Sequence, residues 1–326
     1  MIKFTRNPDV YHGRNKKADF FEGWYFKLVQ PSTGRAYCFI PGIFLSEDSK
    51  KSHSFIQILY GSECSFKYLS YEKEKFKASS SKFDLKVGES SFSLNHIDIK
   101  INEQQVKIQG VLHFNNIIKW PDSIINPGSM GFYNYLSFMQ CYSQVCAVDG
   151  NISGSLTVNG EIIDFTGGKV YIEKNWGSAF PYAYIWLQGN SFDKGRGSVT
   201  CSAGHIPLPE PFKSFSGFLI GIYADSKFYK FTSINKSTLS IKCGSNHIIL
   251  KADNKKYMLN MKAFYNEVTF MDLYAPDGNE MKPSASETLL GNLVVELYDK
   301  TLNRVLFQDN CDSAGIEMSG KYKDLF

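Results

Sequence analysis

Long apolar runs are missing from this sequence of 326 residues, and their absence excludes one class of protein. A membrane-spanning helix needs about 20 consecutive apolar residues, whereas the best run, Phe218 to Ala224, is short and interrupted by Gly221. The chain start, Met1 to Arg6, also lacks the apolar segment of a secretory signal peptide. We therefore expect a soluble protein located in the cytoplasm.

Residues that bind metals or pair in disulfides are few and irregularly spaced. The seven cysteines are odd in number, which suits free thiols in a reducing compartment. Cys141 and Cys146 lie five positions apart, so on a strand they point to opposite faces. The six histidines are scattered, with no two at ligand spacing, and we expect neither a metal nor a cofactor. A net charge of only +4, without a run of Lys or Arg, also argues against a nucleic-acid partner.

Aromatic residues and turn signals are plentiful, with 26 Phe and 19 Tyr favouring strands. Asn159-Gly160 between two apolar segments is a strong signal for a two-residue hairpin, and Asp149-Gly150 supplies another turn. Residues 135 to 175 are therefore predicted to form an antiparallel meander of four strands. Because no long segment has helical spacing, the pattern predicts an all-β protein built of sandwiches or closed barrels. The length allows two domains, which we place at residues 1–192 and 193–326.

Two aromatic segments stand out as candidate binding surfaces. On a strand, Tyr184, Trp186, Gln188 and Asn190 share one face, and such an aromatic face ending in carboxamides suits the floor of an apolar pocket. In the second segment, Phe20, Glu22, Trp24 and Phe26 share a face. A carboxylate within an aromatic stripe is costly to bury unless it is paired or protonated, which draws attention to Glu22.

Seven blocks, among them the segment with Glu22, resemble the tocopherol cyclase family over nearly the whole chain. The blocks that carry the resemblance are Tyr11-His12-Gly13, Phe20 to Lys27, Pro127 to Gly131, Phe138 to Tyr142, Glu173 to Gly177, Gly291 to Leu297 and Gly315 to Met318. The resemblance implies two lipocalin-like antiparallel β-barrel domains in tandem, related to carotenoid hydratase-like proteins. It also implies a cofactor-free cyclisation, in which an acid protonates the tail double bond of a prenylated hydroquinone and the phenol oxygen captures the cation to form a chromanol.

Some residues depart from the family pattern. Gln140 and Ser143 stand where the family usually has Glu and His, and Gly189 stands where a Cys is usual. The loss of an acid and an imidazole favours a non-catalytic alternative, a lipocalin-like carrier of a hydrophobic ligand. An isoprenoid hydratase, in which water captures the same cation, is the other alternative.

Protonating an alkene requires an acid held away from water, beside aromatic rings that stabilise a carbocation. Glu22 and Glu173 are the candidate catalytic acids, with Glu296 as a third carboxyl group near the substrate. Glu22 has a purely structural alternative, pairing with Lys27 or Arg35. The remaining substrate-binding candidates are Trp24, Phe26, Tyr142, Lys174, Asn175, Trp176, Tyr184, Trp186, Gln188 and Asn190.

The partner expected from this chemistry is a lipophilic small molecule. Such a ligand calls for transient membrane contact, for which the Pro-rich segment Pro207 to Phe218 is the candidate. The sequence allows either a monomer or a homodimer.

Overall fold

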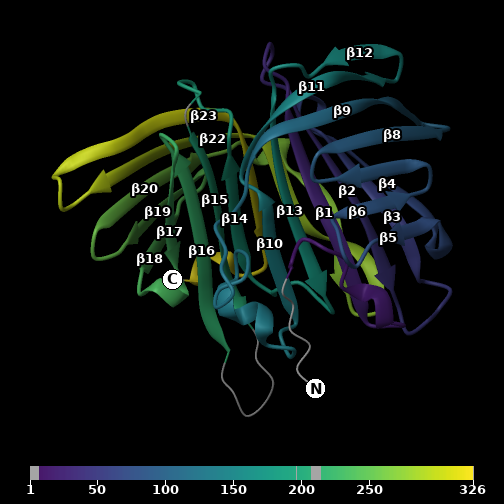
Figure 1. Cartoon of the computed structure of the whole chain (residues 1–326), viewed down its shortest axis with the longest axis horizontal. Coiled ribbons are helices and arrows are strands. Elements are labelled where there is room, and N and C mark those ends of the chain that lie inside the picture. The colour runs from purple at the N-terminus through teal and green to yellow at the C-terminus, as the bar shows by residue number, and fades with distance from the viewer. Residues whose placement is uncertain (1–6, 196, 207–213, 326) are drawn as a thin grey trace.

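The computed structural model describes residues 7–195, 197–206 and 214–325, which consist almost entirely of antiparallel strands arranged in two sheets (Figure 1). The first sheet contains β1 (Phe20–Val29), β2 (Ala36–Leu45), β3 (His53–Tyr60), β4 (Ser65–Glu72), β5 (Phe76–Ala78), β6 (Asp84–Val87), β7 (Ser90–Ser93), β8 (His96–Glu103), β9 (Val106–Ile118), β10 (Cys141–Ala147), β11 (Asp149–Val158), β12 (Glu161–Asp164) and β13 (Lys169–Gly177). The second contains β14 (Tyr184–Gly189), β15 (Gly197–Ile206), β16 (Phe215–Ala224), β17 (Lys227–Thr232), β18 (Thr238–Cys243), β19 (His247–Asp253), β20 (Tyr257–Phe264), β21 (Met271–Asp277), β22 (Glu280–Asp299) and β23 (Arg304–Ser319).

Short 3-10 helices connect some of these strands. They are η1 (Gly13–Asn15), η2 (Gly61–Glu63), η3 (Lys73–Lys75), η4 (Gly131–Tyr135), η5 (Ser233–Asn235), η6 (Glu267–Thr269) and η7 (Tyr322–Asp324). In the described part of the chain, no helix is long and apolar enough to cross a membrane.

Each sheet curls until its two end strands approach each other. In the first sheet, β4 and β5 lie at opposite ends of the strand order, yet only the three residues of η3 join them. In the second, the end strands β17 and β18 are joined by a connection that contains η5. Because such short links cannot span an open sheet of this width, both sheets must be rolled into barrels. The predicted all-β fold of two barrel-like sheets is confirmed.

The region predicted to be a meander does form four strands, β10 to β13, but their order is not that of a meander, because β12 pairs with β11 whereas β10 pairs with β13. At its tightest turn, Val158 pairs with Glu161. The two turn residues both have positive φ, 49° at Asn159 and 95° at Gly160. A two-residue hairpin whose twist matches that of its strands requires this conformation, which explains the Asn-Gly pair.

The two sheets pack against each other through a shared apolar layer. Alternation along β1 sends Trp24 and Phe26 into the core of the first barrel, while Tyr25 and Val29 point the other way. Tyr25 there joins one apolar cluster with Trp186 of β14 and residues of β21 and β22. The change of sheet falls between Gly177 and Tyr184, because β14 pairs with β15 and β23. The boundary expected at 192/193 therefore lies too late along the chain.

Candidate functional site

A mainly apolar cavity of about 210 Å³ lies where the two sheets meet. Strands β1, β2, β3, β10 and β13 form one wall, and strands β14, β15, β16, β21, β22 and β23 form the other. The loop around η4 also contributes to the lining, through Met130, Tyr133 and Met139. The cavity is thus a feature of the seam rather than of either barrel interior.

Glu173 projects from β13 into this cavity and is buried with 4% of its surface exposed. It accepts three hydrogen bonds, from Tyr171 Oη at 2.6 Å, from Trp186 Nε1 at 2.8 Å and from Ser143 Oγ at 2.9 Å. Burial raises the pKa of Glu173, while these donors act in the opposite direction by favouring the ionised form. Ser143, which was expected to be a departure from the family pattern, thus donates a hydrogen bond to this carboxylate.

Glu317 on β23 is the second carboxyl group that lines the cavity. It accepts a hydrogen bond from the Tyr184 hydroxyl. Burial raises the pKa of Glu317 to about 7, the Tyr184 hydrogen bond opposes the rise, and the negative charge of Glu173 adds to it. A carboxyl group with this pKa is protonated in a substantial share of molecules at neutral pH.

Sequence reasoning missed Glu317, although it lies in one of the blocks that resemble the family. The signal was an acidic residue with an apolar neighbour on either side, Ile316 and Met318. Glu296 gave the same signal, yet it lies on β22 without lining the cavity and accepts a hydrogen bond from Asn260. A strand pattern alone does not tell which of these acids faces the seam.

Glu22 lies outside the cavity, which corrects its assignment as a catalytic acid. It points from β1 to the other face, is fully buried, and forms an ion pair with Lys174 at 2.5 Å. A structural pairing was foreseen, but with the wrong partners. Lys27 instead donates to Gln188 Oε1, and Arg35 pairs with Glu161 at the surface.

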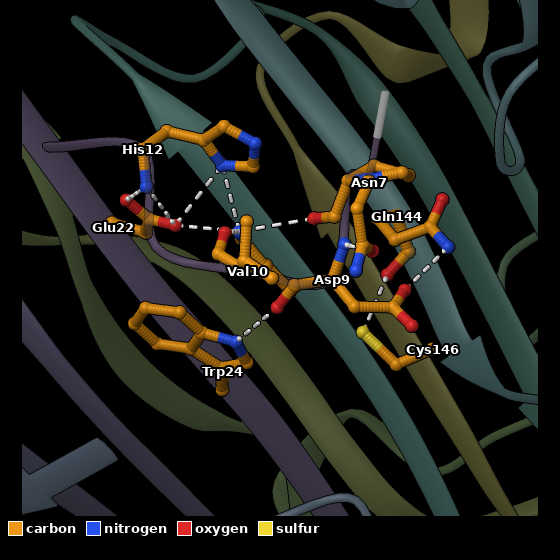
Figure 2. A network of polar contacts seen from close by, with 10 residues as sticks. Asn7, Asp9, Val10, His12, Glu22, Trp24, Gln144 and Cys146 are labelled. Atoms are coloured by element: carbon orange, nitrogen blue, oxygen red, sulfur yellow. Dashed lines mark hydrogen bonds and ion pairs between the residues drawn. The ribbon is translucent and has the colours of Figure 1, made fainter. Parts of the chain in front are cut away.

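The Glu22–Lys174 pair anchors the segment that precedes η1. Figure 2 shows Glu22 beside His12 of this segment. The Lys174 ammonium group donates to the carbonyls of Pro8 and Val10 and to His12 Nδ1. Glu22 accepts from the His12 backbone N–H at 2.9 Å. Lys174 also lies over the rings of Trp24 and Trp176, at 4.9 and 4.5 Å. A buried carboxylate and ammonium with this many partners form a structural cluster.

Asp9 ties the same segment to a second part of the barrel, as Figure 2 shows. Gln144 Nε2 donates to Asp9 Oδ1 at 2.8 Å, and Lys119 pairs with Oδ2 at 2.5 Å. Trp24 Nε1 donates to the Asp9 carbonyl at 3.4 Å. The indole N–H of Trp24 therefore has its hydrogen-bond acceptor within the protein.

Only some of the predicted binding residues come together at the cavity. Tyr142, Asn175, Tyr184 and Trp186 line it with Glu173. The others lie elsewhere: Trp24 and Phe26 in the first barrel core, Lys174 in the cluster with Glu22, Trp176 stacked between His12 and Tyr142, Gln188 against Lys27, Asn190 against the Val170 carbonyl, and Glu296 on β22. Neighbours in sequence diverge because successive strand residues face opposite sides of a sheet.

The segment expected to contact the membrane, Pro207 to Phe218, lies largely outside the residues that the structure describes. Residues 207–213 are not among the described ones. Phe215 and Phe218, which follow them, line the cavity.

Fold and site together define a tandem pair of lipocalin-like β-barrels with a ligand-sized cavity, containing two acids, at their junction. The sequence model of the tocopherol cyclase-like family matches residues 100–320 of the chain. The chain therefore belongs to this family. It is 22% identical over 366 residues to a protein of Oryza sativa subsp. japonica named probable tocopherol cyclase, chloroplastic. That match covers 95% of this chain and 77% of the rice protein.

Two solved structures share the fold at low sequence identity. The crystal structure of CghA superimposes with a TM-score of 0.56 and 9% identity, covering 92% of this chain and 88% of that one. Kievitone hydratase from Nectria haematococca gives a TM-score of 0.51 and 12% identity, covering 99% and 97%. Since the rice relative is named as chloroplastic, the expected cytoplasmic location stays a prediction.

Proposed function

We propose that the chain is an acid-catalysed cyclase that converts a prenylated hydroquinone, or a related isoprenoid phenol, to a chromanol-type product in the cavity at the seam. The observation that carries this proposal is the pair of carboxyl groups, Glu173 and Glu317, at the wall of an apolar cavity. A carrier needs only apolar and neutral polar groups, whereas alkene protonation needs a neutral carboxylic acid in a dry site.

The two carboxyl groups suit different roles because their environments differ. Glu317 accepts a hydrogen bond from Tyr184 and has a pKa of about 7, so it is the proton donor to the alkene. Glu173 accepts from three donors, which stabilise its carboxylate, so it is the acceptor of the phenol proton. One proton leaves Glu317 for carbon, the phenol oxygen bonds to the tertiary cation, and the phenol proton passes to Glu173. The reaction is an isomerisation, and the two carboxyl groups together keep the same number of protons.

Aromatic side chains around the acids supply the environment that a carbocation requires. Tyr25, Phe180 and Trp186 all line the cavity. A cation over the face of such a ring gains about 0.5–2 kcal/mol. The cavity volume of about 210 Å³ is below the roughly 300–1,000 Å³ typical of drug-sized ligands, which favours an aromatic head with a short prenyl tail.

The test is incubation of the purified protein with short-chain prenylated hydroquinones in D2O under reducing, anaerobic conditions. A chromanol with one deuteron on carbon would support the proposal, and Glu317→Gln and Glu173→Gln should each lower its formation at least about 100-fold. Asp312→Asn is the matched control, because Asp312 is exposed on the same strand as Glu317. A labelled alcohol instead of a chromanol would establish hydration. Substrate that binds and is recovered unchanged and unlabelled would establish a carrier and refute the cyclase.

A further inference from the structure

A third carboxyl group, Glu287, lies beside the proposed proton donor without lining the cavity. Glu287 on β22 is the direct cross-strand partner of Glu317 on β23. Side chains of such partners share one face of the sheet, with Cβ atoms about 4.5–5.5 Å apart. Two glutamate carboxyl groups can therefore meet.

Glu287 is fully buried, and within the described chain only one of its two carboxyl oxygens has a hydrogen-bond partner. Its Oε1 accepts from the Tyr25 hydroxyl, while its Oε2 is buried and has no partner among the described residues. Burial raises the pKa of Glu287 well above its usual range, and negative charge on Glu317 raises it further. Glu287 therefore keeps its proton to higher pH than an ordinary glutamate, and a proton on Oε2 would be an unused donor.

The groups that act electrostatically on this pair come from several strands. They are Tyr25 and Lys27 on β1, Cys38 on β2, Glu173 on β13 and Tyr184 on β14. Lys27 lowers the pKa of Glu287, whereas Glu173 raises it. The Lys27 ammonium group donates to Gln188 Oε1 at 2.7 Å and to the Ser313 carbonyl at 2.5 Å. Lys27 is thus held by other partners, and Glu287 has no direct ion pair in the described chain.

We propose that Glu287 is a positioning residue that donates a hydrogen bond from Oε2 to the Glu317 carboxylate as Glu317 gives up its proton. A donor to the charged form of an acid makes that acid stronger, so Glu287 promotes proton transfer without touching the ligand. The proton stays on Glu287, and the pair carries one negative charge after transfer. That Glu317 donates to a ligand rests on the proposed function; the coupling of the two carboxyl groups does not.

The test compares Glu287→Met, which keeps the side-chain length without a donor, with Glu287→Gln, which keeps both an acceptor for Tyr25 and a donor. Loss of the donor destabilises the Glu317 carboxylate, so Glu287→Met should raise the pKa of Glu317 by about one pH unit. Infrared difference titration of the protonated carboxyl band measures this without any substrate, with Glu317→Gln identifying the band. Glu287→Gln should restore the wild-type value, and Asp312→Asn should not change it.

Activity supplies the second readout. Glu287→Met should lower chromanol formation about tenfold and move the alkaline limb of the pH profile to higher pH, and Glu287→Gln should restore both. A Glu317 pKa that is the same in all variants would overturn the proposal. So would equal losses in Glu287→Met and Glu287→Gln with an unmoved limb, because that pattern reports packing. If the wild-type protein forms no chromanol but the titration shifts as expected, the proposed function fails and the carboxyl pair stands.

Discussion

Replacing Glu22 by Gln tests whether this acid holds the structure together or takes part in chemistry. The change keeps the shape of the side chain but leaves the buried Lys174 ammonium group without its counter-ion at 2.5 Å. At an effective dielectric constant of about 20, the attraction between unit charges at that separation is roughly 6–7 kcal/mol. Because the amide still accepts a hydrogen bond, we expect the free energy of unfolding to fall by about 3–5 kcal/mol, the usual loss when one partner of a buried pair is removed.

Urea unfolding followed by tryptophan fluorescence is the assay, because Trp24 and Trp176 flank the Lys174 ammonium group. Glu161→Gln is the matched control. It breaks the exposed pair with Arg35, in which the two side chains are 67% and 42% exposed, and should cost less than about 1 kcal/mol. The double variant Glu22→Gln/Lys174→Met should regain much of the loss, because it leaves no unpaired charge.

The opposite result would refute this reasoning. If Glu22→Gln abolished turnover while its unfolding free energy stayed at the wild-type value, Glu22 would be acting chemically. The assignment drawn from the sequence would then be right, and the structural role assigned here would be wrong.

Three further predictions concern the cavity and the fold. Because the pKa of Glu317 is raised to about 7 in the folded protein, its contribution to stability is fully present below about pH 4.5 and lost as pH rises through about 7. The free energy of unfolding of the wild type, measured in urea, should fall over this range more steeply than that of Glu317→Gln, in which only Glu173 and Glu287 still contribute a slope. Parallel curves would contradict this prediction. Ser202→Phe places a ring in a cavity of about 210 Å³ and should abolish binding of a prenylated hydroquinone at unchanged thermal stability, whereas calorimetric binding at wild-type affinity would place the ligand elsewhere. Gly160→Ala imposes a side chain at φ 95° and should lower the unfolding free energy by about 1–2 kcal/mol in denaturant titration, with no loss if the turn relaxes.

Local patterns of the sequence were sufficient to predict that the protein is built of strands, and to predict its tightest turn. The Asn159-Gly160 pair fixes the hairpin because its residues accept positive φ. Alternation along Tyr184 to Asn190 placed Tyr184 and Trp186 on one face, and both line the cavity. Such features depend on neighbours in the chain, which is why they are visible in the sequence.

The identity of the acids at the seam depended on contacts that the sequence does not contain. Glu22 and Glu173 both lie among aromatic residues on strands, but one faces a barrel interior and the other faces the second sheet. Glu317 and Glu287 meet only because β22 and β23 pair in one particular register. The early boundary between the sheets has the same origin, since β14 belongs with strands that follow much later in the chain.

A cavity at the seam also has a thermodynamic consequence for the whole molecule. Each barrel has its own apolar core, so each has the means to unfold as a separate cooperative unit. A ligand in the cavity contacts both walls, and it is released when either barrel unfolds. Its binding free energy is therefore added to the stability of both barrels at once. We therefore expect two unfolding transitions without ligand and a single one at saturation, so that the degree of merging reports occupancy of the cavity without any measurement of turnover.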